Sequence, residues 1–495
     1  MIFHVNHRTA ADVTGHVMST LPAVINQVGL EQLAAALHVD LDWLPYRANF
    51  REAVVARRTV DAQGSPLEHG EIAIDLAQVE PARFAAEVTE ALRSLRGGFP
   101  ATQLPSHPAT QLPSNSATQQ RVYLDQFGPL RSSVIWQFNR LFWQRLSDWQ
   151  LASGRGSDAV PGDTSDANNL QAIDDTVADF WTLLRDLDGR GQLPAEIFAL
   201  EIGVGTGERA AAWLDRFKAL DEQCGGAYYG RLRFLLGDYS PATLEAALAA
   251  VGRHAPIVSV LALDALNPFK TLSFLRFKVL YIHLTNVYDN LPFDEMVRRG
   301  EGLYLVEVRP YIGASAVQRL ATEHGRTAEQ LPETMKRLFE GGPEAVHEDR
   351  AKGVAFWRCL WGALRLEERL RALDVAEDAH IPAGLSRSHL EDLLAGAPAD
   401  ARFQLSRGAA ESFVNTVPLL HPRGFLQVQD EFVTTMDAYR QEFSGPGKVD
   451  GAIVASVNGA LLRAVASRAG FDVHFAPFRY REGSRTSVLY TTTRD

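Results

Sequence analysis

The stretch Leu200-Glu201-Ile202-Gly203-Val204-Gly205-Thr206-Gly207-Glu208 joins an apolar segment to a turn with three alternating glycines. Residues 197–200 before it have the pattern of a buried strand, and residues 209–214 after it have the pattern of a helix. Glycine permits positive φ, and its missing Cβ lets a ligand lie against the backbone and the helix N-terminus. The stretch therefore predicts a strand, a nucleotide-binding turn and a helix.

The spacing of these glycines distinguishes between two classes of cofactor. The turn has the pattern G-x-G-x-G, whereas the turn that binds dinucleotides has the pattern G-x-G-x-x-G. An acidic residue, Glu201, precedes the first glycine inside the strand. The turn therefore favours S-adenosylmethionine over NAD.

Three further apolar segments, residues 233–238, 257–263 and 278–284, are each followed by polar residues. Ligands of a doubly wound α/β sheet bind outside the carboxyl ends of its strands. The sequence thus predicts four β-α units with a binding site at these ends. The residues that follow the three segments include Asp238, Tyr239, Asp264, Ala265, Asn286, Tyr288 and Asp289.

With these units the chain resembles the class I S-adenosylmethionine-dependent methyltransferases, which have a Rossmann-like α/β sheet. Within that class it is similar to the MidA-type family, whose members are assigned as protein-arginine methyltransferases and include mitochondrial respiratory-complex assembly factors. The similarity is carried by the turn at residues 201–207, the D-x-L-P element at residues 289–292, and residues 424–430, which resemble the family's fifth strand. Residues 446–450 are similar to the family's P-G-x-x-D loop.

The resemblance implies roles for the residues at the strand ends. Asp238 would bind the ribose hydroxyls of S-adenosylmethionine, and Asp264 would lie near its adenine. Glu201 and the glycines would surround its methionine and ribose portions. The cofactor site implied in this way consists of Glu201, Gly203, Gly205, Gly207, Asp238, Tyr239, Asp264 and Ala265.

The acceptor of the methyl group would lie at the end of the fourth strand. Methyl transfer depends mainly on orientation, and it needs a general base only where the acceptor is protonated. Asp289 is the first candidate for that base, although a turn-forming role explains it equally well. Residues 290–293 resemble an element of amino-methyltransferases, which favours nitrogen over carbon as acceptor. Asn286 and Tyr288 are expected to orient the acceptor, and Trp136, Pro292 and Asp430 to contact it.

Two other functions remain open from the sequence. The chain could methylate nitrogen or oxygen of a small metabolite in a biosynthetic pathway, or it could be an assembly protein that binds S-adenosylmethionine without transferring its methyl group. A closed apolar pocket would favour a metabolite, and an open acidic groove would favour an arginine-bearing protein.

Composition changes along the chain predict its domain organisation. Residues 99–120 contain the sequence A-T-Q-L-P-S twice and are expected to form a flexible linker after a helical or mixed N-terminal domain, residues 1–98. Helical patterns include residues 30–44 in that domain and 452–469 near the end of the chain, and residues 303–308 have a strand pattern. Residues 121–169 are expected to form a helical segment and a loop that cap the site. Residues 170–312 and 399–495 are expected to form a methyltransferase domain that ends in an antiparallel hairpin. Residues 313–398 are expected to be a helical insertion for substrate binding or dimerisation.

Composition also excludes several classes of function. The net charge is −11 and no run of five basic residues occurs, which argues against nucleic acid. The chain has two cysteines, Cys224 and Cys359, too few for a disulfide framework, and no apolar stretch long enough to span a membrane. The chain also lacks an H-x-x-x-H or C-x-x-C pattern, so no metal site is expected. We therefore predict a cytoplasmic protein. The helical insertion could also serve to form a homodimer.

Overall fold

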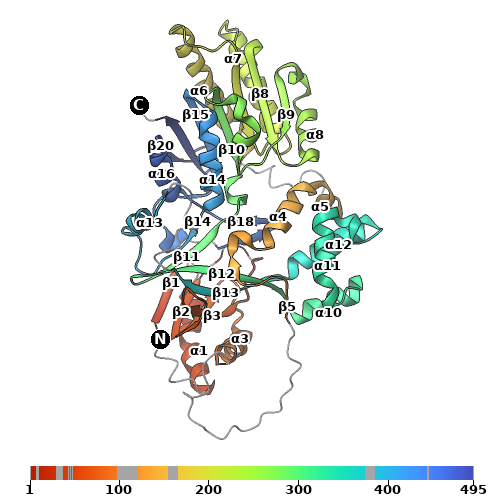
Figure 1. Cartoon of the computed structure of the whole chain (residues 1–495), viewed down its shortest axis with the longest axis vertical. Coiled ribbons are helices and arrows are strands. Elements are labelled where there is room, and N and C mark those ends of the chain that lie inside the picture. Colours follow the sequence, from red (N-terminus) through yellow and green to blue (C-terminus); the bar gives the residue numbers. More distant parts are fainter. Residues whose placement is uncertain are drawn as a thin grey trace.

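The computed structural model describes residues 2–6, 11–28, 37–42, 44, 46, 48–96, 121–153, 166–373, 385–442 and 445–493. Two sheets lie one above the other along the long axis of the molecule, with a group of helices beside the lower one (Figure 1). The expected flexible linker at 99–120 and the loop at 154–165 lie outside the described residues.

The upper sheet has seven strands, and only β21 runs antiparallel to its neighbours. Numbered along the chain, the strands lie in the order 3-2-1-4-5-7-6. This is the Rossmann-like arrangement of class I methyltransferases, so the predicted fold class and the closing hairpin are confirmed. In sheet order the strands are β9 (Val258–Ala262), β8 (Leu232–Asp238), β7 (Ile197–Ile202), β10 (Val279–Thr285), β15 (Leu420–Asp430), β21 (Ser487–Thr493) and β20 (Phe471–Pro477).

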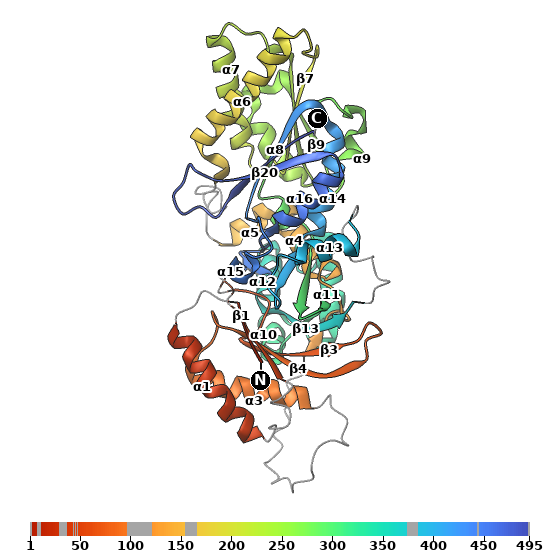
Figure 2. The ribbon, with the colours of Figure 1, turned by 90° about the vertical axis from the view of Figure 1, so that its left-hand side faces the viewer.

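Helices cover both faces of this sheet and make it a three-layer structure (Figure 2). Two of them have strong N-caps: the side chain of Asn169 accepts from two backbone N–H groups of α6, and Ser240 caps α8, which has Pro241 in its first turn. One face packs against α6 (Leu170–Gly189), α7 (Glu208–Gln223) and α8 (Pro241–Ala250). The other packs against α9 (Pro268–Leu272), α14 (Arg407–Thr416) and α16 (Gly459–Arg468).

The lower sheet combines segments from distant parts of the chain. Strand β3 pairs in parallel with β13, so the N-terminal strands and the strands of the insertion form one continuous sheet. In order the strands are β1 (Ile2–Asn6), β2 (Leu37–Asp42), β4 (Pro66–Asp75), β3 (Val54–Val60), β13 (Leu364–Ala372), β12 (Gly302–Ile312), β11 (Asp294–Arg299) and β14 (Arg402–Leu405), with β5 (Val122–Tyr123) and β6 (Gly128–Pro129) also on β12.

Two groups of helices pack around the lower sheet. The N-terminal strands are covered by α1 (Ala11–Val28) and α3 (Pro81–Arg96). A second hydrophobic core joins β12 and β13 to α4 (Ile135–Gln144), α5 (Leu146–Ser153), α10 (Ala314–His324), α11 (Leu331–Gly341) and α12 (Arg350–Ala363). The remaining short elements include the pairs β16 (Phe432–Val433) with β19 (Val457–Asn458) and β17 (Gly447–Val449) with β18 (Ala452–Val454), and helices α13 (Arg387–Leu394) and α15 (Tyr439–Glu442).

Buried ion pairs hold the lower sheet together. Arg57 is fully buried and donates hydrogen bonds of 2.7 Å to Glu368 on β13 and to Asp40 on β2. Glu368 also accepts from Arg51 at 2.9 Å and from Arg402. Buried charges are tolerated only when they are paired and hydrogen-bonded, so removing one of these side chains would leave an uncompensated charge.

The structure differs from the expected organisation in four segments. Residues 294–312 belong to the lower sheet and not to the upper sheet, because β11 pairs with β12 and β14, and β12 pairs with β13. The insertion is not wholly helical, since β13 lies within it. Residues 37–42 form a strand instead of continuing a helix, and the helix expected at 452–469 begins only at residue 459, after strands β18 and β19. Sequence patterns could not show the pairing of β11 with β14 or of β12 with β13, because these partner strands are distant in the chain.

Among the described residues, no helix combines the length and the apolar character that crossing a membrane requires.

Candidate functional site

The glycine turn lies between β7 and α7. Gly203, Gly205 and Gly207 have φ of +74°, +56° and +80°, values that side chains rarely adopt. A Cβ on Gly203 would lie 2.5 Å from Val287, and one on Gly207 would lie 2.6 Å from the backbone of α8. A Cβ on Gly205 would meet nothing within 4 Å. Two glycines thus permit close packing, and the middle one faces open space.

Asp238 ends the neighbouring strand β8 beside this turn. Its Oδ1 accepts from the backbone N–H of Ser240 at 2.9 Å. Burial raises the pKa of Asp238 to about 6. Hydrogen bonds from the backbone N–H groups of Ser240, Tyr239 and Gly205 lower this pKa and so oppose the effect of burial. The turn and the carboxylate are therefore adjacent, as predicted.

Glu201 lies beneath the turn and takes part in a buried ion pair. Its Oε2 accepts from Arg209 on α7 at 2.9 Å, and Arg209 also donates to the hydroxyl of Tyr281 at 2.8 Å. Burial raises the pKa of Glu201, and Arg209 opposes this effect. The ion pair fixes α7 against β7, so the position of Glu201 supports a positioning role more than direct contact with a cofactor.

The other predicted cofactor residues lie at the ends of β8 and β9. Asp264 is exposed, and its Oδ1 accepts from the backbone N–H of Leu266 at 3.0 Å. Ala265 is half-buried against the core beneath it. The hydroxyl of Tyr239 donates to the backbone carbonyl of Arg140 at 3.4 Å and so links the site to α4.

A tight turn follows β10 and carries the predicted acceptor-site residues. Asn286 has φ +50°, and its N–H donates to the carbonyl of Gln429 at 2.9 Å. The side-chain amide of Asn290 donates to the Asn286 carbonyl at 3.1 Å and to Asp289 Oδ1 at 2.8 Å. The turn is thus closed by Asn290, which the sequence analysis did not single out.

Asp430, at the end of β15, anchors this turn from the neighbouring strand. Its Oδ2 accepts from the N–H groups of Tyr288 at 2.9 Å and Asp289 at 3.2 Å, and its Oδ1 accepts from that of Glu431 at 2.8 Å. Asp430 is 1% exposed, so the structure places it as a positioning residue and not in contact with an acceptor.

The carboxyl groups of Asp289 and Asp430 form a pair. Burial and the nearby Asp430 raise the pKa of Asp289 well above its usual range. Burial raises the pKa of Asp430 to about 7, while three backbone N–H groups lower it. Because Asp430 accepts from three backbone N–H groups, its ionised form is the better stabilised of the two.

Three predicted acceptor residues lie in packed positions. Tyr288 is 2% exposed and its ring belongs to the core between β10 and α14. Trp136 packs edge-on against Phe293, with ring centroids 5.5 Å apart, and donates to the carbonyl of Leu130. The carbonyl of Pro292 accepts from the N–H of Gly408 at 2.8 Å. The expected contacts of the Tyr288 and Trp136 side chains with an acceptor do not fit these positions, because apolar packing holds both.

Helix α4 contacts the turn through residues that the sequence analysis missed. Trp143 donates to Asn290 Oδ1 at 3.0 Å, and Asn139 donates to the Asn290 carbonyl at 3.3 Å. Asn139 Oδ1 also accepts from the N–H of Ile453 on β18 at 2.9 Å. Helix α4 therefore contacts the turn through an amide and an indole N–H, which lie on the same side of the helix as Ile135 and Trp136.

A tyrosine from the N-terminal part of the chain approaches the same site. Burial, Glu431 and Asp289 together raise the pKa of Tyr46 to about 12, while Arg485 lowers it. Gly447 is required beside the Tyr46 ring, which occupies the space of a Cβ there. Since Tyr46 lies about 240 residues from the turn in sequence, no local pattern could have indicated this contact.

No protein-family model matches the chain, and no curated protein matches it. Among solved structures, an uncharacterized protein from Burkholderia thailandensis is similar at 15% identity and TM-score 0.42, covering 74% of this chain and 87% of that one. A second member of the same superfamily and organism, inferred to be a methyl transferase and bound to S-adenosyl-homocysteine, is similar at 16% identity and TM-score 0.38, covering 66% and 76%. An O-methyltransferase family protein from that organism has 10% identity and TM-score 0.27, covering 73% and 72%.

Proposed function

We propose that the chain is an S-adenosylmethionine-dependent methyltransferase that binds its cofactor at the carboxyl ends of β7, β8 and β9. One observation carries the proposal: the open glycine turn at Gly205 lies directly beside the Asp238 carboxylate, within a sheet of the methyltransferase strand order. Cofactors of doubly wound sheets bind at this position.

Each part of this site would bind a different part of the cofactor. Gly205 leaves room for the ligand against the backbone, and the N-terminus of α7 favours a negatively charged group such as the methionine carboxylate. Asp238 would accept hydrogen bonds from the two ribose hydroxyls. Asp264 and Ala265 would lie beside the adenine. When bound, S-adenosylmethionine supplies a methyl group that a nucleophile displaces from its sulfonium sulfur.

The acceptor is proposed to be a nitrogen that carries a proton, with oxygen as the alternative. Asp289, Asp430 and Glu431 concentrate three carboxyl groups at the end of β10 and β15. A cationic acceptor beside Asp289 would favour its ionised form, and Asp289 could then accept the proton of the acceptor nitrogen as general base. Asn286 and Tyr46 would orient the acceptor.

Two acceptor classes follow from this chemistry. The resemblance to the MidA-type family supports an arginine side chain of a protein. A small metabolite is supported by the contacts of α4 and Tyr46 around the turn, which cover the site from two parts of the chain. A non-catalytic assembly protein is the remaining alternative, and it would bind the cofactor without forming a methylated product.

The proposal is tested first by calorimetric titration with S-adenosylmethionine, with NAD as the control. We expect micromolar binding of S-adenosylmethionine only. Formation of S-adenosyl-homocysteine is then measured with arginine-bearing peptides and with small amines as acceptors. Asp289→Asn should lower transfer about 100-fold or more and leave cofactor affinity unchanged. Binding of NAD alone, or of neither ligand, would refute the cofactor site, whereas cofactor binding without transfer to any acceptor would support the assembly protein.

A further inference from the structure

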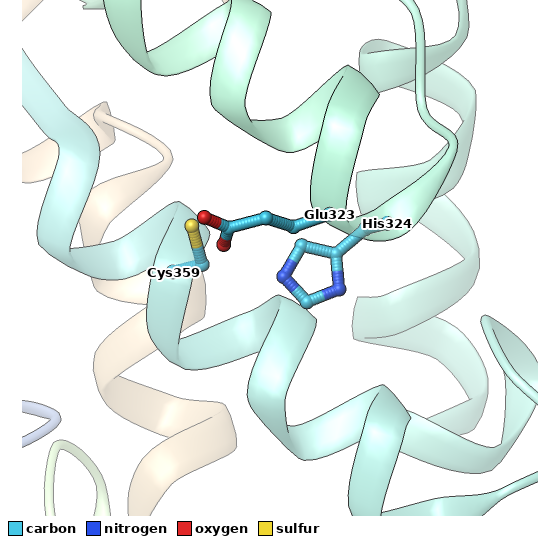
Figure 3. A group of neighbouring side chains, drawn as sticks. All are labelled: Glu323, His324 and Cys359. Carbon is cyan, nitrogen blue, oxygen red and sulfur yellow. The ribbon is translucent and has the colours of Figure 1, made fainter.

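A second cluster of reactive side chains lies in the helical part of the insertion, away from the methyltransferase site. Glu323 and His324 are the last two residues of α10, and Cys359 lies on α12 (Figure 3). One ligand atom from each residue lies within 4.8 Å of the others. These atoms face a common space between the two helices.

The three groups match the chemistry of a transition-metal site. Carboxylate, imidazole and thiolate are the ligands that Zn²⁺ prefers, and in a tetrahedral site their atoms lie roughly 3.3 to 3.6 Å apart. Closing the cluster from its present size would therefore need shifts of about 1 Å, which side-chain rotations can supply.

The surroundings leave the three groups available. Within the described part of the chain, no residue forms a hydrogen bond or an ion pair with the Glu323 carboxylate, the His324 ring or the Cys359 thiol. The His324 ring packs edge-on against Phe356, with centroids 5.6 Å apart, which limits its orientation. The cluster thus contains three strong ligands without a structural partner.

Electrostatic features of the helices also suit a cation. Helix α10 ends at His324, and Gly325 follows it in the left-handed conformation, so the negative end of the helix dipole lies at the cluster.

We propose that Glu323, His324 and Cys359 bind one Zn²⁺ or a similar divalent transition-metal ion, with water as the fourth ligand. The Cys359 thiol loses its proton to solvent when its sulfur binds the ion. His347 lies near His324, but its Nδ1 already accepts a hydrogen bond from the N–H of Asp349 at 2.9 Å, so this nitrogen is not available to the ion. The bound ion would fasten the end of α10 to α12.

This site was not expected from the sequence, because its ligands follow none of the usual metal-binding spacings. Two of them are adjacent in the chain, and the third lies on another helix 35 residues later. Only the packing of α10 against α12 brings them together.

The proposal is tested on the full chain with Co²⁺ as a probe, because cobalt bound to a thiolate has a charge-transfer absorption band. We expect one equivalent of Co²⁺ to produce the band and Zn²⁺ to abolish it by competition. Cys359→Ser should lose the band. Cys224→Ser is the matched control: Cys224 is exposed, follows α7 in the other domain, and its variant should keep the band.

A further variant separates metal binding from folding. The Glu323 side chain is exposed, so Glu323→Gln should keep the far-ultraviolet circular dichroism of the wild type while lowering Co²⁺ affinity at least about tenfold, since changes even in residues behind a metal ligand cost about 10 to 100-fold. Unchanged affinity in Glu323→Gln, a band that persists in Cys359→Ser, or the absence of a band in the wild type would each overturn the proposal.

Discussion

The substitution Asp238→Asn should stabilise the ligand-free protein while weakening cofactor binding. Burial raises the pKa of Asp238 from 3.8 to about 6. The ionised carboxylate is therefore less favourable in the folded protein than in the unfolded chain. Asparagine has the same shape and no charge. Its side-chain oxygen can still accept from the backbone N–H of Ser240, as Asp238 does at 2.9 Å.

The size of this effect follows from the pKa shift. A rise of about two units corresponds to about 3 kcal/mol, because each unit is worth about 1.4 kcal/mol. The folded state binds the proton more tightly than the unfolded state, so the cost of ionisation is absent below about pH 4, grows between about pH 4 and pH 6, and is complete above that range. Asp238→Asn should therefore raise the free energy of unfolding by up to about 3 kcal/mol at neutral pH and leave it unchanged near pH 4.

Cofactor binding should change in the opposite direction. Replacing two charge-assisted hydrogen bonds to the ribose by neutral ones should cost roughly 2 to 4 kcal/mol, which is a loss of affinity of about 30-fold or more. Since the ionised form binds the ribose, the affinity of the wild type should also fall as the pH drops below about 6. The variant should lose this pH dependence.

Urea denaturation at several pH values and calorimetric titration with S-adenosylmethionine measure the two effects. Asp264→Asn is the matched control for stability, because Asp264 also ends a strand segment of this site but is exposed. Lower stability of Asp238→Asn at neutral pH, or a gain that persists near pH 4, would refute the assignment of the pKa shift to burial. Unchanged cofactor affinity would refute the ribose contact.

Substitutions at three other places test the packing around the site: the glycine turn, the Glu201–Arg209 ion pair and Asn139 on α4. Gly205→Ala should lower the free energy of unfolding by only roughly 1 to 2 kcal/mol, the cost of a left-handed backbone at alanine, yet it should abolish measurable cofactor binding. Gly207→Ala should lower the Tm further, because its Cβ would lie 2.6 Å from the backbone of α8. Arg209→Met should lower the free energy of unfolding by about 3 to 5 kcal/mol, and adding Glu201→Gln should recover part of it, since the single change leaves a buried carboxylate unpaired. Asn139→Ala removes two hydrogen bonds of α4, of which the one to Ile453 is buried, and should cost roughly 1 to 3 kcal/mol, measured as a lower Tm; an unchanged Tm would show that α4 does not depend on them.

The upper sheet could be predicted from the sequence because its signals are local. The glycine turn, the Ser240-Pro241 helix start and the strand ending at Asp238 each need only a few adjacent residues. The lower sheet could not be predicted in the same way. Strand β3 pairs with β13 about 310 residues later, and no periodicity within either segment indicates its partner.

The acceptor site was predicted only in part, for a related reason. Asp289 was identified from a local motif, but the side chains around it come from α4, β15 and the loop at Tyr46. Tyr288 and Trp136 were chosen by residue type. Whether an aromatic side chain faces a site or a core depends on tertiary packing, and both face the core.

Because β3 pairs with β13, the N-terminal strands cannot complete the lower sheet until β13 has been synthesised on the ribosome. Arg57 meets its partner Glu368 only after 311 further residues have been made. At about 5 to 20 residues per second this interval lasts roughly 15 to 60 s. During that time the edge of β3 that later pairs with β13 stays open to other nascent chains. Chaperone dependence should therefore be concentrated in the first hundred residues, although the upper sheet, with the proposed cofactor site, lies elsewhere.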